Sequence, residues 1–325
     1  MIRFATIGTN QIVDKLLAAA AHCPALVHSA VYSRREDTGA AFALKHGCSR
    51  VFTSLEALAS DPDIDAVYIA SPNLCHKEQA LLMLQADKHV LCEKPIALTA
   101  ADFEEMLSAA REHHVVLMEA MRPLHAPGLQ TVQELLPRLG KIRRATLQFC
   151  QYSSRYDKFR AGIVENAFDP SLGNGALMDI GIYPLQVMEA LFGLPRQMTG
   201  ASVFLPTGVD GEGTLLAAYD EMLCEVVYSK ITQGQTPSQI QGEDGVLLIS
   251  GVNCITEVTH LPRRGEKTVY QVDLPNGGDM VCELESFVRQ IENGGMEEEW
   301  IAHSRNVMAL LDDARKMMGI DFVRK

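Results

Sequence analysis

The side chains of Ser33, Arg34 and Arg35 are of types that can bind a phosphate group. Ser33, Arg34 and Arg35 follow an apolar segment in direct succession. A hydroxyl and two guanidinium groups can hold a phosphate through charge-assisted hydrogen bonds, whereas a carboxylate would repel it. NAD-specific domains carry an acid here for the ribose hydroxyls. The segment therefore predicts NADP(H) as cofactor, although a solvated basic loop would look the same, and Glu36 nearby leaves NAD open as a second cofactor.

A second candidate for phosphate contact follows the first apolar segment, in Gly8-Thr9-Asn10-Gln11-Ile12-Val13. A dinucleotide fingerprint has three glycines, G-x-G-x-x-G, so that backbone amides and a helix N-terminus meet the pyrophosphate. Only Gly8 is present. Asn10 replaces the second glycine and tolerates a left-handed turn, but its side chain would crowd the phosphate, and Val13 replaces the third. Gly8 could be an ordinary turn residue. Otherwise the loop supplies cofactor contacts from Gly8, Thr9, Asn10 and Ile12.

Both groups of residues stand at the ends of predicted strands, in a part of the chain where short apolar runs alternate with helical patterns. Strands are predicted at Ile2–Ile7, Leu26–Tyr32, Asp65–Ala70, His89–Cys92 and Val115–Met118. Helices are predicted at Gln11–His22, Thr38–His46, His76–Gln85 and Thr99–Glu112. Thr53-Ser54-Leu55-Glu56 fits a capping box that begins a further helix. This alternation is typical of a doubly wound Rossmann domain with a parallel sheet.

The pattern changes beyond Arg122-Pro123, where we place the boundary between domain 1–122 and domain 123–325. Long segments of alternating polarity follow at Ile142–Tyr152, Thr199–Leu205, Gly213–Tyr219, Met222–Ser229, Val246–Ser250 and Lys267–Val272. Turns are predicted at Asp210-Gly211 and Asn276-Gly277, and helices at Met280–Glu292 and Ser304–Met318. The fold class is thus α/β, with an N-terminal Rossmann domain and a C-terminal α+β domain that has a large, mostly antiparallel, open-faced sheet.

The composition limits the partners of the protein. The 325 residues carry a formal net charge of −12, which argues against a surface for nucleic acid or anionic lipid. No apolar run approaches the roughly 20 residues of a membrane span, and the start does not resemble a signal peptide. The eight cysteines include no CxxC pair, so we expect reduced, buried thiols and a cytoplasmic location. No cluster of ligands has metal spacing.

Three motifs occur in fixed order along the chain. They are Ala70-Ser71-Pro72-Asn73-Leu74-Cys75-His76, then Cys92-Glu93-Lys94-Pro95, then Gly173-Asn174-Gly175-Ala176-Leu177-Met178-Asp179-Ile180-Gly181-Ile182-Tyr183-Pro184. They resemble the a-x-P-n-x-x-H, E-K-P and G-G-x-x-x-D-x-G-x-H/Y motifs of the glucose–fructose oxidoreductase, inositol dehydrogenase and rhizopine-catabolism (Gfo/Idh/MocA) family. Together with the two-domain plan, the resemblance covers nearly the whole chain. It implies an NAD(P)-dependent oxidoreductase.

The resemblance implies a catalytic role for Lys94. Hydride transfer at a carbinol carbon requires a proton to leave or reach the attached oxygen. Lys94 follows a strand's carboxyl end, where open α/β sheets bind ligands, and its ammonium could hydrogen-bond that oxygen. A surface lysine is the alternative. Glu93 would position Lys94 or the nicotinamide ribose, and Pro95 would fix the turn, with a cis bond as one option.

Asp179 and Tyr183 complete the catalytic set that the resemblance implies. Their spacing of four residues places both on one face of a helix. Many relatives have histidine at the second position, and this chain resembles a tyrosine subgroup in which the phenol donates a proton during reduction. Asp179 would orient a substrate hydroxyl or the lysine. The alternative is that Asp179 caps the helix and Tyr183 is a half-buried core aromatic.

Other polar residues have less certain roles. Glu119 is a candidate for fixing the backbone or the cofactor side, and the loop Gln151–Lys158 could contact substrate hydroxyls or be an ordinary loop. His76 lines the nicotinamide pocket or is a satisfied histidine at a helix start. The predicted cofactor contacts on this side are Ser71, Pro72, Asn73, His76, Glu93 and Lys94.

The resemblance implies a carbohydrate-like or diol substrate, such as a polyol, a sugar, a sugar-derived carbonyl or a dihydrodiol. The second domain would bind this substrate and, because an uncovered sheet face would be apolar, form a homodimer or homotetramer. A catalytically silent, dinucleotide-binding regulator on the same fold is the alternative. The incomplete glycine loop favours that alternative, whereas Lys94, Asp179 and Tyr183 together favour an enzyme.

Overall fold

A computed structural model describes residues 1–322, which form two compact units. The first unit consists of Met1–Met121 and Pro275–Arg305, and the second of Arg122–Leu274 with the residues from Asn306 onward. The first boundary falls one residue from the predicted one. The segment Pro275–Arg305 groups with the first unit, which differs from the continuous C-terminal domain predicted from sequence.

The first unit is built on a six-stranded parallel sheet with the order β3-β2-β1-β4-β5-β6. Its strands are β1 (Ile2–Ile7), β2 (Leu26–Tyr32), β3 (Val51–Phe52), β4 (Ala66–Ile69), β5 (His89–Glu93) and β6 (Leu117–Ala120). All residues of β4 are buried, as expected of a strand covered on both faces. The doubly wound prediction is confirmed, and β3 is a strand that the sequence reading did not name.

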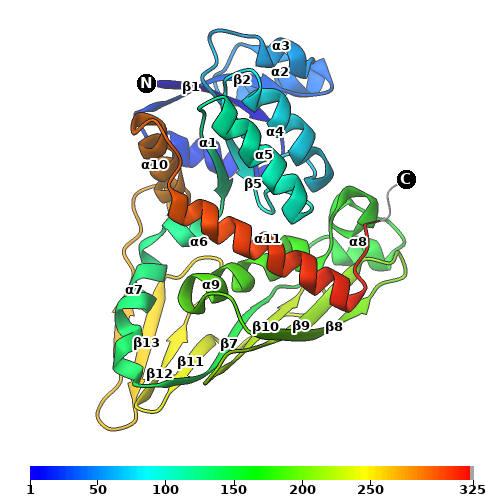
Figure 1. Ribbon diagram of the computed structural model, residues 1–325. Coiled ribbons are helices and arrows are strands. Elements are labelled where there is room, and N and C mark those ends of the chain that lie inside the picture. Colours follow the sequence, from blue (N-terminus) through cyan, green and yellow to red (C-terminus); the bar gives the residue numbers. More distant parts are fainter. Residues whose placement is uncertain (323–325) are drawn as a thin grey trace. The chain divides into compact units, whose positions relative to one another are not determined.

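Helices flank this sheet in the order that the alternation predicts. They are α1 (Gln11–Ala20), α2 (Glu36–Lys45), α3 (Leu55–Ala59), α4 (His76–Leu84), α5 (Ala100–Glu112) and α10 (Asp279–Glu292), with a 3₁₀ turn η1 (Asn73–Cys75). The apolar sides of α1 and α10 pack in one core with β1, and α4 lies beside α5 (Figure 1). The predicted capping box is wrong by one residue, because Ser54 rather than Thr53 accepts the amide of Ala57.

The second unit contains an eight-stranded sheet with the order β14-β13-β12-β11-β7-β10-β9-β8. The strands are β7 (Ile142–Cys150), β8 (Gln197–Phe204), β9 (Asp210–Ala218), β10 (Leu223–Ser229), β11 (Ser238–Gly242), β12 (Gly245–Ile249), β13 (Glu257–Pro262) and β14 (Thr268–Gln271). Only β7 and β10 pair in parallel, so the mostly antiparallel prediction is confirmed. The strands β11 and β13 were not predicted from the sequence, and the turn predicted at Asp210-Gly211 is wrong because these residues begin β9.

Helices cover one face of this sheet. The elements are α6 (Arg122–His125), α7 (Pro127–Leu135), α8 (Tyr156–Arg160), α9 (Ile182–Phe192), the 3₁₀ turns η2 (Leu136–Leu139), η3 (Asn166–Phe168) and η4 (Pro170–Leu172), and the π-helical turn η5 (Leu177–Gly181). The helix α11 (Glu298–Met318) ends the described secondary structure. Buried residues that alternate along β7, β9 and β10 face α9 and η5, including Leu147, Leu215 and Val226.

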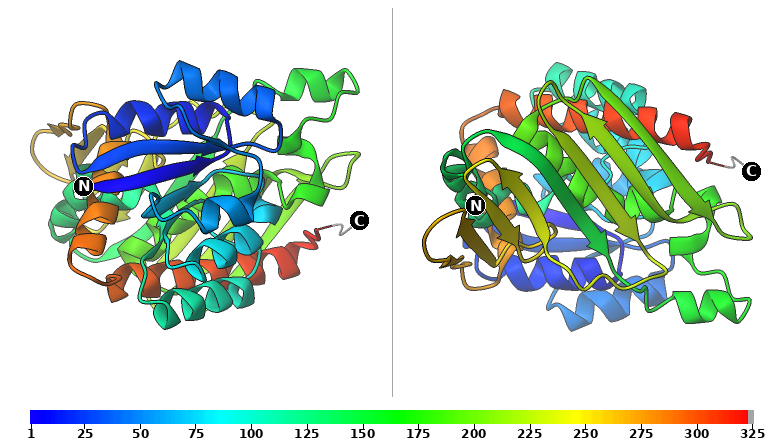
Figure 2. Two further views of the ribbon diagram at one scale, coloured as in Figure 1. Left: turned by 90° about the horizontal axis from the view of Figure 1, so that it is seen from above. Right: turned by 90° about the horizontal axis from the view of Figure 1, so that it is seen from below.

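The other face of the sheet is turned outward, as the right-hand view of Figure 2 shows. Its central strands present Thr146, Gln148 and Gln239, whereas exposed apolar side chains are found at Leu216 and Leu223. The expectation of a broad apolar surface is therefore wrong for β7 and β11, because their outward residues are polar.

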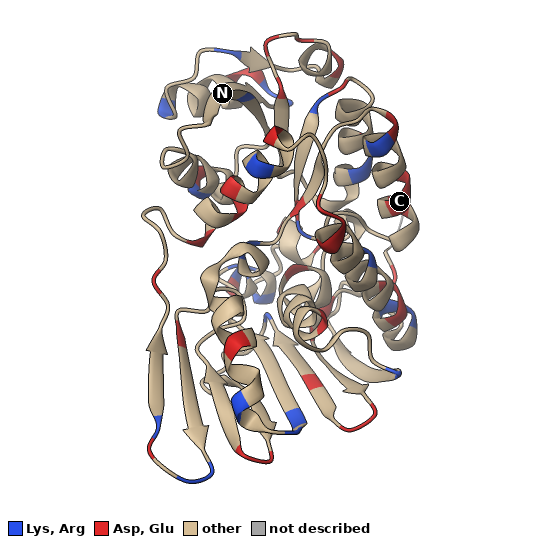
Figure 3. Ribbon diagram, turned by 60° about the vertical axis from the view of Figure 1, so that its left-hand side comes forward, with Lys and Arg blue, Asp and Glu red and all other residues tan. Residues whose placement is uncertain are grey.

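Charged residues of both signs are interspersed over both units in the view of Figure 3. Within residues 1–322, no helix combines the length and apolar character needed to cross a bilayer. Half of the cysteines are buried and half are partly exposed, which corrects the expectation of buried thiols for Cys75, Cys150, Cys254 and Cys282.

Candidate active site

The loop between β1 and α1 requires a glycine at its start. Gly8 has φ +122°, and a Cβ there would lie 2.9 Å from the carbonyl oxygen of Ala70 at the end of β4. The backbone conformation and this close approach both require glycine, as does the first position of a dinucleotide fingerprint for its tight turn. Any residue with a side chain at position 8 would therefore be strained and would clash with Ala70.

Asn10 acts as the N-cap of α1. Its Oδ1 accepts hydrogen bonds from the amides of Ile12 (3.1 Å) and Val13 (3.3 Å), and its Nδ2 donates to the carbonyl of Ala70 at 2.8 Å. Asn10 has φ −90° and extended backbone, so it does not use the left-handed conformation that asparagine tolerates. The side chain satisfies two helix amides, and a pyrophosphate would contact other groups of the loop or displace it. Val13 is fully buried in the core, where the fingerprint has glycine.

The end of β2 positions the basic segment. Ser33 is buried, and its Oγ accepts from the amide of Arg35 at 3.4 Å. Arg35 is exposed and forms a two-point ion pair with Asp37, with contacts of 3.0 Å and 2.5 Å. Arg34 is also exposed; burial raises the pKa of the nearby Cys75 thiol, and the charge of Arg34 offsets part of this rise. Arg34 therefore lies near the turn after β4, whereas Arg35 forms an ion pair with Asp37.

His76 is completely buried at the start of α4. Its Nδ1 lies 2.9 Å from the carbonyl oxygen of Pro95, and its Nε2 lies 3.0 Å from that of Ser71. Burial is the main cause that lowers the pKa of the imidazole. This geometry agrees with the alternative of a satisfied histidine rather than a pocket-lining one. Ser71, Pro72 and Asn73 are partly exposed in the same turn, and the hydroxyl of Ser71 donates to Gln79.

The Glu-Lys-Pro turn follows β5 and is fixed from several sides. The Lys94–Pro95 bond is cis, which confirms that option. The carboxylate of buried Glu119 accepts the amide of Ile96 at 3.0 Å and the hydroxyl of Ser304 at 3.1 Å. Glu119 thus holds the backbone of the turn, which is the first of its two predicted roles. Lys94 itself is partly exposed.

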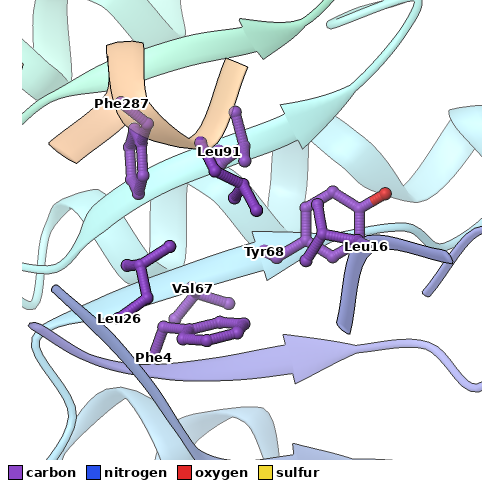
Figure 4. A pocket seen from close by; sticks show the side chains of 8 residues that line it. Phe4, Leu16, Leu26, Val67, Tyr68, Leu91 and Phe287 are labelled. Atoms are coloured by element: carbon purple, nitrogen blue, oxygen red, sulfur yellow. The ribbon is translucent and has the colours of Figure 1, made fainter. Parts of the chain in front are cut away.

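Glu93 has a partner that the sequence reading missed. The hydroxyl of Tyr68 on β4 donates to its Oε1 at 2.5 Å. The ring of Tyr68 lines a small apolar gap in the core, and its oxygen points away from that gap (Figure 4). Burial, followed by the charge of Glu93, raises the pKa of Tyr68, which keeps this phenol a donor. No sequence pattern singled out Tyr68, because it lies in a strand whose residues are all buried and therefore looks like a core residue.

Asp179 and Tyr183 lie in the second unit, on the π-helical turn η5 and the first turn of α9. Tyr183 is buried and packs edge-on against Phe149 of β7, with ring centroids 5.5 Å apart. The turn approaches β10 closely, because a Cβ at Gly181 would lie 2.9 Å from the ring of Tyr228. The helix start is capped by Asp210, whose Oδ2 accepts the amide of Leu177 at 2.7 Å.

A second residue that sequence reasoning missed is Lys230, directly after β10. Its ammonium forms an ion pair with Asp179 Oδ2, and its side chain is only 4% exposed. The alternation of buried and more exposed residues along β10 is the sequence signal that could have predicted the burial of Lys230. Cys224, Val226 and Tyr228 face inward, so a lysine two positions further continues the buried face.

The loop Gln151–Lys158 is organised by aromatic contacts. Tyr156 stacks on Phe159 and tilts against Phe168, while the hydroxyl of Tyr152 donates to Asp157 at 2.7 Å. These contacts make it a packed segment of the second unit. Among residues 1–322, no group of three or more His, Cys, Asp or Glu side chains is arranged to hold a metal ion.

Comparisons with known proteins agree with this arrangement. Residues 2–121 match the family model described as "Oxidoreductase family, NAD-binding Rossmann fold". Residues 129–248 match the GFO/IDH/MocA C-terminal domain. The chain belongs to the Gfo/Idh/MocA family of oxidoreductases. It is thus an oxidoreductase with an NAD-binding Rossmann domain, as the motif resemblance implies.

Curated relatives extend over the whole chain. The scyllo-inositol 2-dehydrogenase (NADP(+)) IolU of Bacillus subtilis (strain 168) is 43% identical over 322 residues, which cover 98% of each chain. The trans-1,2-dihydrobenzene-1,2-diol dehydrogenase of Xenopus tropicalis is 29% identical over 97% of each chain. Among solved structures, the 3-ketoreductase KijD10 of Actinomadura kijaniata with NADP and TDP-benzene superposes with a TM-score of 0.87 at 24% identity, covering 98% of each chain. This likeness shows a shared fold.

Proposed function

We propose that this protein is an NADP(H)-preferring oxidoreductase that acts on a CH–OH group, or the corresponding carbonyl, of a polyol, sugar or diol. The observation that carries the cofactor assignment is the end of β2, where Ser33, Arg34 and Arg35 occupy the place of the ribose-binding acid. The name of the Bacillus subtilis relative, which specifies NADP(+), supports the same assignment.

The two arginines contribute differently to this proposal. Arg35 already pairs with Asp37, so a 2′-phosphate would have to compete with that carboxylate. Arg34 lies toward Cys75 and the turn after β4, where its guanidinium could meet the phosphate directly. Arg34 is therefore proposed as the principal phosphate ligand. The loop from Gly8 to Ile12 would hold the pyrophosphate, and Ser71, Pro72 and Asn73 would flank the cofactor.

The catalytic roles follow from residue chemistry. The cofactor, when bound, accepts or supplies the hydride. Lys94 would donate a hydrogen bond to the reacting oxygen, and Tyr183 would give that oxygen a proton during reduction and remove it during oxidation. Asp179 would accept a hydrogen bond from a substrate hydroxyl. The hydrogen bond from Ile96 to Glu119 beside Lys94 and the packing of Tyr183 on Phe149 support these roles, because a fixed surrounding holds a reacting side chain in place.

The substrate class is supported by the relatives. The names of two of them specify scyllo-inositol and a dihydrodiol, which are both vicinal diols. A neutral diol also suits a carboxylate such as Asp179, since its second hydroxyl can donate a hydrogen bond. We therefore propose a polyol or other diol substrate.

A homodimer or homotetramer through the outward face of the eight-stranded sheet is part of the proposal. Exposed Leu216 and Leu223 lie on neighbouring strands of that face and would be covered by a second copy. Light scattering at micromolar concentration should give a dimer or tetramer. A monodisperse monomer would remove this part of the proposal.

The test of the activity is a screen of inositols, aldoses and cyclic diols with NADP⁺, in which NADPH formation is followed by its absorbance. Turnover of at least one polyol is expected, and Tyr183→Phe should lower it by about 10²-fold, the usual contribution of a proton donor. Turnover that is the same in wild type and Tyr183→Phe would contradict the proposed role of Tyr183. Cofactor binding without turnover of any compound would favour a regulatory protein.

A further inference from the structure

Lys230 is a buried cation that the family motifs do not contain. Its side chain is 4% exposed, and its ammonium pairs with Oδ2 of Asp179, which is 37% exposed. The same nitrogen lies 3.5 Å from the carbonyl oxygen of Ala167 and 5.3 Å from the centre of the Phe168 ring. A carboxylate, a carbonyl oxygen and an aromatic ring thus surround the ammonium.

The backbone fixes the direction in which Lys230 points. Its amide donates to the carbonyl of Gly211 at 2.9 Å, which extends the pairing of β9 and β10 by one residue. The hydroxyl of Ser229 accepts the amides of Ile231 (3.2 Å) and Thr232 (2.9 Å), so the chain turns directly after Lys230. The lysine stem thus continues the inward face of β10.

The carboxylate of Asp179, which pairs with Lys230, also lies in a turn that is fixed by neighbouring residues. Asp179 lies in the π-helical turn, and Asp210 caps the start of that turn through the amide of Leu177. A Cβ at Gly175 would lie 2.0 Å from Oδ1 of Asp210, so a residue larger than glycine would displace this cap. Lys230 also attracts Asp210 electrostatically. Lys230 therefore interacts with two carboxylates of the same turn: Asp179, which lies in it, and Asp210, which accepts the amide at its start.

The two side chains of the Asp179–Lys230 pair differ in their exposure to solvent, and this difference indicates what the pair does. A buried ion pair is weak support for stability, because desolvation offsets most of the Coulomb attraction. Here the lysine is buried while the carboxylate remains partly exposed, so the carboxylate can still meet a small molecule. A fixed cation behind it restricts its rotation.

We propose that Lys230 is a positioning residue for the reaction: it holds Asp179 as an oriented carboxylate acceptor for a hydroxyl of the diol substrate. This inference rests on the proposed function, which assigns Asp179 to the substrate. It adds a residue outside the three sequence motifs, from a strand of the second unit.

The test compares Lys230→Met, Lys230→Arg, Asp179→Asn and the double variant Lys230→Met/Asp179→Asn, assayed with NADP⁺ and the best polyol of the screen. Lys141→Met is the matched control, because Lys141 forms an exposed ion pair with Glu221 in the same unit. Lys230→Met should raise KM and lower kcat/KM by at least tenfold while the Kd of NADPH stays unchanged. Lys230→Arg should recover part of the loss, and the double variant should be no worse than Asp179→Asn alone.

Three results would overturn the inference. Lys230→Met could keep wild-type kcat and KM while Asp179→Asn loses activity, which would leave the proposed function in place. The double variant could lose activity additively, which would mean that Lys230 acts independently of Asp179. If Lys230→Met does not fold, Lys230→Arg decides instead. A Lys230→Arg protein that is as stable as wild type but has no activity would count against the inference. Full activity in Asp179→Asn would instead contradict the proposed function.

Discussion

The buried ring of His76 lies 2.9 Å from the carbonyl oxygen of Pro95, so the start of α4 is joined to the turn that carries Lys94. The other ring nitrogen faces the carbonyl of Ser71 at 3.0 Å. A neutral imidazole donates from only one nitrogen, and burial keeps the pKa of His76 below its ordinary value. The ring thus lies between two loops of the first unit and donates a hydrogen bond to one of the two carbonyls.

Replacing His76 with alanine should loosen the Lys94 turn. We expect kcat to fall roughly tenfold and the free energy of unfolding to fall by about 1–3 kcal/mol, the cost of leaving a buried polar group without its partner. Steady-state kinetics and thermal unfolding measure the two effects. His113→Ala, which removes a partly exposed histidine of the same unit, is the control. Wild-type kcat in His76→Ala would show that the contacts of His76 with Pro95 and Ser71 do not matter for catalysis.

Lys94→Ala should abolish turnover while NADPH binding largely survives. The reason is that the ammonium is proposed to act on the reacting oxygen rather than on the cofactor. Stopped-flow hydride transfer and a fluorescence titration separate these effects. Lys45→Ala, at an exposed lysine of the same unit, should behave as wild type. Retained turnover in Lys94→Ala would remove the catalytic assignment.

Gly181→Ala tests the close approach of the π-helical turn to β10. The new methyl group would lie 2.9 Å from the Tyr228 ring, which is 1% exposed and has little room to move. Overpacking of this kind costs about 1–3 kcal/mol, and displacement of Asp179 should lower kcat/KM as well. Gly295→Ala is the control, because no atom lies within 4 Å of its added Cβ. A crystal structure of Gly181→Ala with an unmoved turn would contradict this account.

Asp210 should make stability depend on pH. Burial raises the pKa of its carboxyl from 3.8 to about 6. A carboxyl with a higher pKa in the folded than in the unfolded chain stabilises the folded state at low pH, and this contribution is lost as the pH rises from about 4 to about 6. Asp210→Asn keeps an acceptor for Leu177 but does not titrate. Its advantage over wild type should therefore grow across this window by about 2–3 kcal/mol.

Urea unfolding between pH 4 and pH 7.5 measures this difference. Asp220→Asn, at an exposed carboxylate of the same unit, should give a profile parallel to wild type. Parallel profiles for Asp210→Asn and wild type would mean that Asp210 keeps an ordinary pKa in the folded protein.

Much of the first unit could be predicted from sequence, because local patterns determine it. Apolar runs such as Ile2–Ile7 and Leu26–Tyr32 became strands with the predicted bounds. The missed features depend on contacts between distant residues. Lys230 and Asp210 become parts of the site only when β9 and β10 pair beneath the turn at Leu177–Gly181, and spacing along the chain does not reveal that pairing.

Two other errors have a similar physical origin. The strands β11 and β13 are short and contain polar residues such as Gln239 and His260, so alternation was a weak signal there. The helix cap formed by Asn10 was not predicted either, because asparagine tolerates several turn conformations besides a cap.

The most direct test of the central claim is a fluorescence titration of the purified protein with NADPH and with NADH. We expect a Kd for NADPH at least tenfold lower than for NADH. We also expect that Arg34→Ala weakens NADPH binding about tenfold or more, the value of one charge-assisted hydrogen bond, with NADH unaffected. Equal or tighter binding of NADH would contradict the phosphate site at Ser33-Arg34-Arg35. Binding of neither cofactor would contradict the proposed enzyme itself.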